Sequence, residues 1–198
     1  MTTLNSRETT HSQSFQAKRV SCSYKEKIRA SPEQIFPLAC PVQEYKWIDR
    51  WQCEIVYSVS RVAENNCIFK EDKTGPLLFD STVSTYWVIS LYDPDNFRIQ
   101  FVLITSGIMI AKIDVEIKAF DDDRSSVDWM FTITPTSEEA NRMIGTGTEK
   151  KAKLYLTILG KSLKHYCENG KLLKLDKASI MKMGLSASIV ELLNAHVK

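Results

Sequence analysis

The chain has 198 residues, of which 43% are hydrophobic and 25% are charged, with a net charge of +2 at pH 7. This length and composition are typical of one globular domain with a substantial core. The nearly balanced charge gives no support for nucleic-acid binding, and no apolar run is long enough to span a membrane or to serve as a signal peptide.

The cysteines and histidines do not form recognisable metal-binding or redox motifs. The five cysteines are scattered and never form a CxxC pair, which is typical of reduced thiols in a cytoplasmic protein. The three histidines show no HxxxH or HExxH spacing. The run 121–123 lacks the spacing of an EF-hand loop, and 145–148 lacks a dinucleotide fingerprint. We therefore expect no metal and no cofactor.

The composition divides the chain into three parts. Residues 1–17 are rich in polar residues and are expected to be a disordered leader. Residues 18–173 form the domain, and 174–198 form a tail with a short helix that Ser186 or Ser188 can cap. That helix is short and only weakly basic, so we favour packing on the domain or on a partner subunit over contact with a membrane surface.

The first predicted elements are a strand followed by two short helices. Polar and apolar residues alternate over 18–29, which predicts a half-buried strand. Ser31 and Pro32 then supply an N-cap and a first-turn proline, so a short helix begins there. Pro41 ends it, and 42–48 predict a second helical turn.

Six further strands follow in hairpin succession, separated by turn signals such as 93–96. Their expected ranges are 51–60, 67–72, 81–92, 97–105, 109–119 and 127–133. Strand 97–105 is apolar on both faces, so either Phe101 faces inward and Arg98 outward, or the reverse. Apolarity on both faces of this strand and of 81–92 suggests a covered outer side, which makes a homodimer a hypothesis.

A long amphipathic helix is predicted from Ser137 to Asn169, with Gly170 ending it. Gly145 and Gly147 lie on or beside its apolar stripe. Each glycine costs about 1 kcal/mol relative to alanine in a helix interior. They either leave space for a ligand or mark a kink, and the sequence leaves both interpretations open.

Runs of strands with segregated helices indicate an α+β domain. The order of these strands and helices over about 18–173 resembles the helix-grip fold of the START-like (SRPBCC) superfamily. The segments that carry the resemblance are Ile28–Phe36 at the strand-to-helix entry, Glu44–Ile48 with Trp51 as in the polyketide cyclase/dehydrase branch, and the turns at 92–94 and 105–107. The resemblance implies a curved antiparallel sheet of about seven strands wrapped around a long C-terminal helix.

The resemblance also implies a mainly apolar cavity between sheet and helix that holds a lipid, polyketide or aromatic compound. The alternatives are an enzyme of the polyketide cyclase or aromatase type, and a protein-interaction module like the Hsp90 activators. The resemblance carries over no catalytic residue. The candidate cavity residues are Glu26, Trp47, Trp51, Tyr57, Tyr86, Arg98, Phe101, Trp129, Phe131, Met143, Tyr155 and Leu159.

Two alternatives accompany these candidates. Each large aromatic residue taken singly is more often core than ligand contact. Glu26 shares the parity of the inward residues of its strand, where a carboxylate is costly unless paired or solvated, and exposure at the strand end is the interpretation we favour.

Overall fold

A computed structural model describes residues 15–72, 83–121, 123–145, 147–186 and 189. Three sequence predictions lie outside these residues wholly or in large part. They are the leader at 1–17, the connection around Gly75-Pro76, and the final helix after Ser186 or Ser188.

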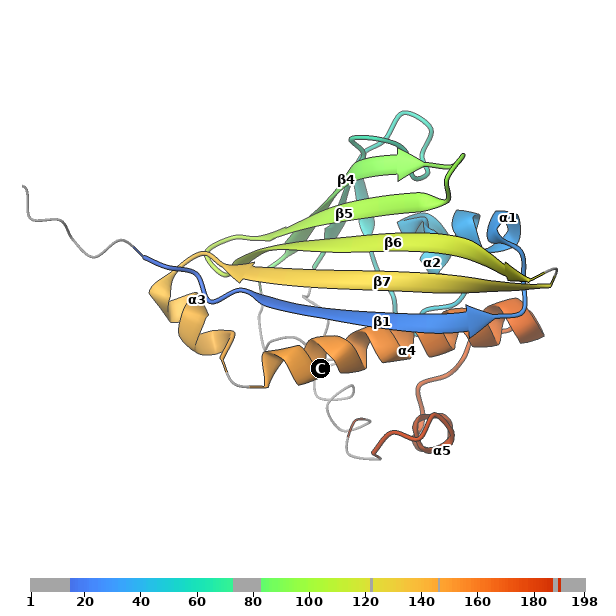
Figure 1. Ribbon diagram of the computed structural model, residues 1–198. Coiled ribbons are helices and arrows are strands. Elements are labelled where there is room, and N and C mark those ends of the chain that lie inside the picture. The colour runs from blue at the N-terminus through green and yellow to red at the C-terminus, as the bar shows by residue number, and fades with distance from the viewer. Residues whose placement is uncertain (1–14, 73–82, 122, 146, 187–188, 190–198) are drawn as a thin grey trace, which may run out of the picture.

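Seven strands form one antiparallel sheet in the order β1-β7-β6-β5-β4-β3-β2 (Figure 1). Strands β2 to β7 pair consecutively, and β1 joins the sheet beside β7. The strands are β1 Val20–Ile28, β2 Glu54–Tyr57, β3 Ile68–Glu71, β4 Thr85–Asp93, β5 Arg98–Thr105, β6 Met109–Asp121 and β7 Arg124–Pro135. The predicted α+β architecture is confirmed.

Short helices connect β1 to β2, and longer ones follow β7. They are α1 Pro32–Ile35, the 3-10 helix Phe36–Ala39, α2 Pro41–Glu44, α3 Glu138–Met143, α4 Thr148–Asn169 and α5 Lys177–Lys182. At the start of α1 the Gln34 side chain accepts the Ser31 amide at 2.9 Å. Figure 1 shows α4 running along β1, with α1 and α2 at the end of the sheet where β1 finishes.

The helix predicted over 137–169 is two helices. Ser137 caps α3 as expected, since its Oγ accepts the Ala140 amide at 3.0 Å. The helix then ends at Met143, and Gly147 takes φ +105°, a conformation that costs glycine little and other residues much. Gly147 therefore marks the break between helices α3 and α4. A Cβ at this position would meet nothing within 4 Å, so the glycine does not relieve crowding.

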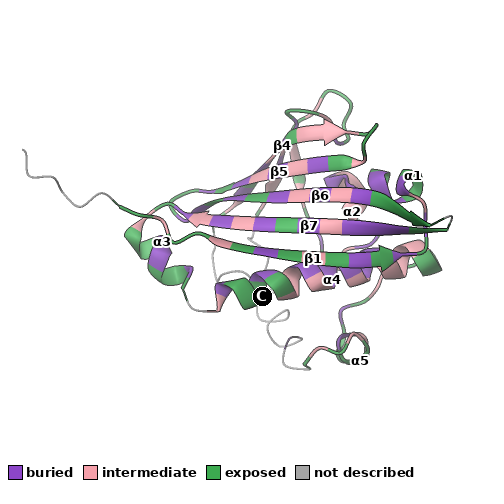
Figure 2. Cartoon of the chain, viewed as in Figure 1, coloured by how far each residue is buried: buried purple, intermediate pink, exposed green. Residues whose placement is uncertain are grey.

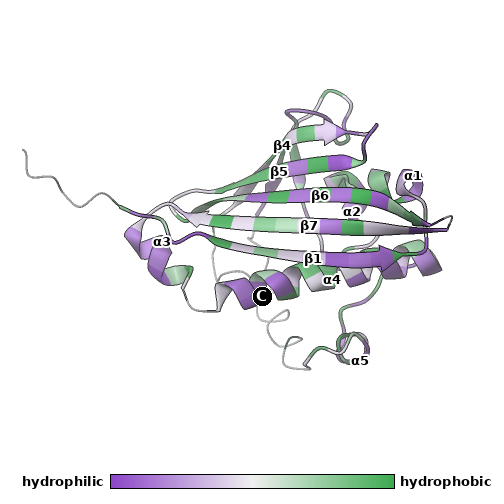
Figure 3. Cartoon of the chain, viewed as in Figure 1, coloured by the Kyte–Doolittle hydropathy of each residue, from purple (hydrophilic) through white to green (hydrophobic). Residues whose placement is uncertain are grey.

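The inner face of the sheet supplies most of the core. Figure 2 shows buried and exposed residues alternating along the strands. Figure 3 shows apolar and polar residues alternating in the same way. In β5, Ile99, Phe101 and Leu103 are buried and Arg98 is exposed, which selects the first of the two registers that the sequence left open. A tight contact joins α4 to β1, because a Cβ on Gly160 would lie 2.5 Å from Cε1 of Tyr24.

The chain after α4 packs against the outer side of that helix. Ile158, Leu175, Ile180 and Ile189 form a second apolar cluster there. Asp49 anchors the same segment, because its carboxylate accepts the Leu175 amide at 3.1 Å and lies 3.0 Å from the Lys174 ammonium. No helix within the described ranges is long and apolar enough to cross a membrane.

Candidate functional site

A cavity lies between the inner face of the sheet, α4 and the α1–α2 segment. The volume in which the centre of a water molecule can lie is about 30 Å³. The cavity therefore has room for about one or two water molecules. Its lining residues are Ile35, Ala39, Glu44, Trp47, Ile48, Trp87, Phe101, Ile113, Val115, Ile117, Val127, Trp129, Tyr155, Leu159 and Leu163. The walls are therefore apolar and rich in tryptophan, with two polar residues among them.

The aromatic walls are held in place by specific contacts. The Trp47 indole N–H donates to the Leu38 carbonyl at 2.8 Å. The Trp87 ring meets Phe101 edge to face, with centroids 5.8 Å apart. Because the Trp47 N–H is already bonded inside the protein, its ring surface is what remains for contact with a ligand.

Glu44 is the first of the polar groups. It ends α2, and its side chain lines the cavity. The Glu44 side chain is half-buried. No described residue bonds or pairs with its carboxyl group. Burial, and secondarily the charge of Glu71, raise the pKa of Glu44 well above its usual value.

Glu71 is the second acidic group and comes from the opposite wall. It lies at the end of β3, with the parity of the buried Phe69, so it points to the inner side of the sheet. The Trp87 indole N–H donates to its carboxylate at 3.1 Å. Burial raises the pKa of Glu71 to about 8, although the Trp87 hydrogen bond opposes this. Glu71 does not itself line the cavity, but Trp87 does.

Tyr155 completes the polar group from α4. Its ring packs on Phe131 with centroids 6.2 Å apart, and its side chain lines the cavity. Burial, followed by the charges of Glu71 and Glu44, raises the pKa of Tyr155 well above its usual value. Burial thus favours the neutral form of all three groups, and in that form each can donate and accept hydrogen bonds.

The structure brings five of the sequence candidates to the cavity. They are Trp47, Phe101, Trp129, Tyr155 and Leu159. Two more, Trp51 and Phe131, are buried in the surrounding core without lining the cavity. Trp51 donates its indole N–H to the Pro41 carbonyl at 2.8 Å and packs edge to face against Trp87, so it supports the wall from behind.

Two predicted cavity residues on strands lie at the surface and are corrected here. Tyr57 is 56% exposed, because a register shift between Ile55 and Tyr57 inserts an extra residue and turns the tyrosine outward. Tyr86 is 44% exposed, because Trp87 takes the inward position on β4. Neither tyrosine lines the cavity.

Two further candidates are also corrected. Arg98 points away from the cavity, because Ile99 and Phe101 hold the inward positions of β5. Met143 is 44% exposed at the last residue of α3, where the helix ends and its apolar stripe is interrupted.

Glu26 is buried, as its strand parity indicated, but it belongs to the β1–α4 contact. Its carboxylate accepts the Tyr24 hydroxyl at 2.6 Å and pairs with Lys161 at 2.9 Å and Lys164 at 3.4 Å. Burial opposes ionisation of this group, but the Tyr24 and Lys161 hydrogen bonds outweigh it and lower the pKa of Glu26. The strand-end exposure that we favoured is wrong, since Glu26 is only 6% exposed.

Sequence reasoning missed Glu44 and Glu71 as site residues. Glu71 could have been found from the inward parity of Cys67 and Phe69, the argument that was applied to Glu26. Glu44 stands three residues before Trp47, a spacing that places two side chains on one helical face.

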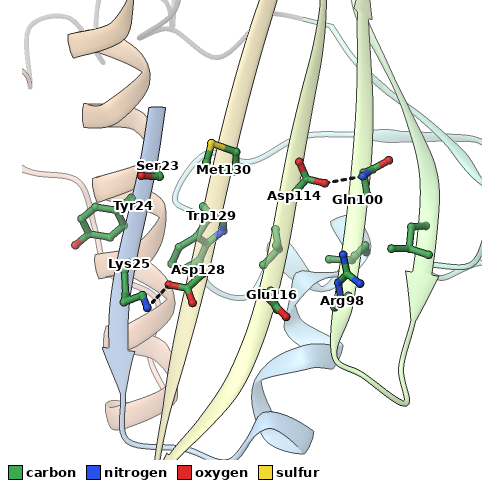
Figure 4. A pocket seen from close by; sticks show the side chains of 13 residues that line it. Ser23, Tyr24, Lys25, Arg98, Gln100, Asp114, Glu116, Asp128, Trp129 and Met130 are labelled. Carbon is green, nitrogen blue, oxygen red and sulfur yellow. Dashed lines mark hydrogen bonds and ion pairs between the residues drawn. The ribbon is translucent and has the colours of Figure 1, made fainter. Parts of the chain in front are cut away.

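A larger hollow of about 380 Å³ lies on the outer face of the sheet. Figure 4 shows polar and charged side chains paired across neighbouring strands, with Lys25 beside Asp128 and Gln100 beside Asp114. The Lys25 ammonium lies 3.0 Å from the Asp128 carboxylate. Arg98 lies on this face, near its strand neighbour Glu116. Because these groups are open to solvent and largely paired with one another, we assign the functional site to the interior cavity.

The sequence matches no known family model and no curated protein. Solved structures do match. The Zhui aromatase/cyclase from Streptomyces sp. R1128 has a TM-score of 0.58 and 11% identity, covering 78% of this chain and 99% of that one. A START superfamily protein from Mycobacterium smegmatis has a TM-score of 0.57 and 14% identity, covering 76% and 99%.

Norcoclaurine synthase from Thalictrum flavum has a TM-score of 0.57 and 10% identity, covering 85% of this chain and 98% of that one. At these identities the similarity establishes the fold and does not by itself establish an activity. The sheet order, the long C-terminal helix and these neighbours agree: the chain has a START-like helix-grip fold.

Proposed function

We propose that the protein binds a small hydrophobic ligand in the interior cavity, against Trp47, Trp129 and Leu159, with a polar group of the ligand meeting Glu44 and Tyr155. The observation that carries this proposal is the polar group itself. One carboxyl group, from Glu44 on α2, and one phenol, from Tyr155 on α4, line the same apolar space. A carboxyl group in an apolar wall is costly unless it is paired or solvated, which supports a role in binding.

The size of the cavity sets a condition on this proposal. Pockets for small molecules commonly measure about 300–1,000 Å³, so the walls must separate before an aromatic ring enters. The segment that best suits such movement is Pro32–Glu44, since it consists of three four-residue helices that are too short to be stable alone. It carries Ile35, Ala39 and Glu44 of the cavity wall.

A second candidate is an enzyme of the polyketide cyclase or aromatase type, acting in the same cavity. The presence of Glu44 and Tyr155 on one cavity wall supports it, because an acid and a base within one apolar site can move a proton on a folded substrate. A protein-interaction module of the Hsp90-activator kind has less support, because a core that serves only as a scaffold has no need of inward acids.

We also propose two features of the protein in solution. The outer face carries the exposed residues Tyr86, Ile104 and Ile110 side by side across β4, β5 and β6, which supports a homodimer through this face. A monodisperse monomer at high concentration by light scattering would exclude it.

The cysteines are all unpaired in the described residues, which supports a cytoplasmic location.

Calorimetric titration with 2-naphthylmethanol, a neutral aromatic probe, tests the binding proposal. We expect one site per chain in the wild-type protein and loss of binding in Leu159→Phe, which adds a ring to the cavity wall. The matched control is Ile104→Phe, which adds the same ring on the exposed outer face. Binding that survives Leu159→Phe and fails in Ile104→Phe would refute the proposal.

A further inference from the structure

One wall of the cavity is a segment that is braced mainly within itself. The Trp47 indole N–H donates to the Leu38 carbonyl at 2.8 Å. The Trp51 indole N–H donates to the Pro41 carbonyl at the same distance. Because these bonds join residues 38–51 to one another, we expect this segment to move as one unit and to carry the cavity residue Trp47 with it.

The other two walls are held more firmly. Backbone hydrogen bonds join the strands of the sheet from β4 to β7. Helix α4 is tied to β1 by the ion pair between Glu26 and Lys161 at 2.9 Å. It also lies so close to β1 that a Cβ on Gly160 would meet the Tyr24 ring. The cavity therefore opens most easily where the segment 38–51 meets α4.

The chain after α4 reaches one side of this joint through Asp49. We call residues 171–186 the C-terminal strap, and Figure 1 shows this part of the chain leaving the end of α4 and turning back beside that helix. The Asp49 side chain is only 9% exposed. It accepts the Leu175 amide at 3.1 Å and lies 3.0 Å from the Lys174 ammonium. Asp49 directly follows the cavity residue Ile48.

The C-terminal strap reaches the other side of the joint through apolar packing on α4. Ile180 is fully buried in a cluster that contains Leu175 and the α4 residue Ile158. Tyr155 packs against the same cluster and also lines the cavity. The strap thus contacts both walls of the joint and holds them together.

We infer that the C-terminal strap closes the entrance to the cavity, and that a ligand enters when the contacts of Asp49 break and the segment 38–51 moves away from α4. The inference rests on the proposed function, since it names how the same cavity admits its ligand. The Lys174 side chain is 72% exposed, so water can reach this contact and replace the donors of Asp49 during opening. The strap can then be released by a local movement, without unfolding of the domain.

The rates of ligand binding test the inference. NMR line shapes of the Trp47 and Trp87 indole signals during titration of the full chain with 2-naphthylmethanol give koff, because both rings line the cavity. Calorimetry with the same probe gives Kd, and the two values together give kon. A strap that controls both entry and exit changes both rate constants by the same factor and leaves Kd nearly unchanged.

Two variants release the strap by different routes. Asp49→Ala removes the acceptor of the Leu175 amide, and Ile180→Ala removes the packing on α4 without touching the cavity. Each should raise kon and koff by at least about tenfold and change Kd by less than about threefold. Retained binding of the probe also shows that a variant is folded, and either variant alone is sufficient for the test.

Two control variants separate release of the strap from other effects. Asp95→Ala removes an exposed carboxylate from the turn between β4 and β5. Ile133→Ala loses buried packing in the main core, on β7, without touching the strap or the cavity lining. Both should leave the two rate constants unchanged.

The outcomes separate this inference from the binding proposal. Unchanged rates in the strap variants would overturn the inference and leave the binding proposal standing. Rates that rise equally in Ile133→Ala would also overturn it, since they would mean that any loss of stability opens the cavity. Failure of 2-naphthylmethanol to bind the wild-type protein would overturn the binding proposal and the inference with it.

Discussion

The buried acids predict an unusual dependence of stability on pH. Glu71 has a pKa of about 8 in the folded protein and about 4.5 when unfolded. The folded state therefore holds a proton that the unfolded state releases across this range. Stability must fall as pH rises from about 4.5 to about 8, and it levels off above that. Glu71→Gln removes this dependence, since glutamine is neutral at every pH.

The size of the effect follows from the displacement of the pKa. At about 1.4 kcal/mol for each pH unit, the shift from 4.5 to about 8 sets an upper limit of about 5 kcal/mol. Glu71→Gln should thus match the wild type near pH 4.5 and exceed its unfolding free energy by up to about 5 kcal/mol at pH 9. Glu44 contributes a loss of the same sign, because its pKa is also raised.

Urea unfolding at half-unit steps from pH 4.5 to 9 would measure this difference. The control is Glu139→Gln, whose curve should run parallel to the wild type because that side chain is exposed. Parallel curves for Glu71→Gln and the wild type would refute the reasoning, since they would mean that Glu71 ionises in the folded protein as easily as in water.

Three further substitutions test the packing. Gly160→Ala should lower the unfolding free energy by about 1–2 kcal/mol in urea despite alanine's better helix propensity, because its Cβ would lie 2.5 Å from the Tyr24 ring; a more stable variant would show that the contact is loose. Glu26→Gln should cost about 1–3 kcal/mol at pH 7, and the cost should shrink as pH falls, because the lowered pKa stabilises the fold only above the unfolded value; a cost independent of pH would contradict this. Phe131→Ala should cost about 3–5 kcal/mol and Tyr57→Ala less than about 0.5 kcal/mol by thermal or urea unfolding, and similar costs would contradict their assigned positions.

The fold could be predicted from the sequence because its periodicity is regular where the sheet is regular. From Met109 to Ile117 in β6 and from Val127 to Ile133 in β7 every second residue is apolar, and all of these residues are buried. The helix start and stop signals were also reliable, since Ser137 caps a helix and Gly170 ends one. These signals depend on neighbouring residues alone.

The cavity residues that were predicted wrongly depend on contacts between distant segments of the chain. Tyr57 has the right parity for the cavity, but the register shift in β2 reverses its direction. Met143 lies on the apolar stripe, but the break at Gly147 separates it from α4. Glu44 became a site residue only through the fold, because α2 and the inner face of the sheet, which lie far apart in the chain, form one cavity.

The central claim is that ligands enter the interior cavity and not the hollow on the outer face. Two-dimensional ¹H–¹⁵N NMR during titration with 2-naphthylmethanol tests it directly, because each surface carries its own side-chain N–H reporters. The account predicts saturating shifts of the Trp47 and Trp87 indole signals, whose rings line the cavity. Shifts confined to the Gln100 side-chain amide and its neighbours on the outer face would contradict it.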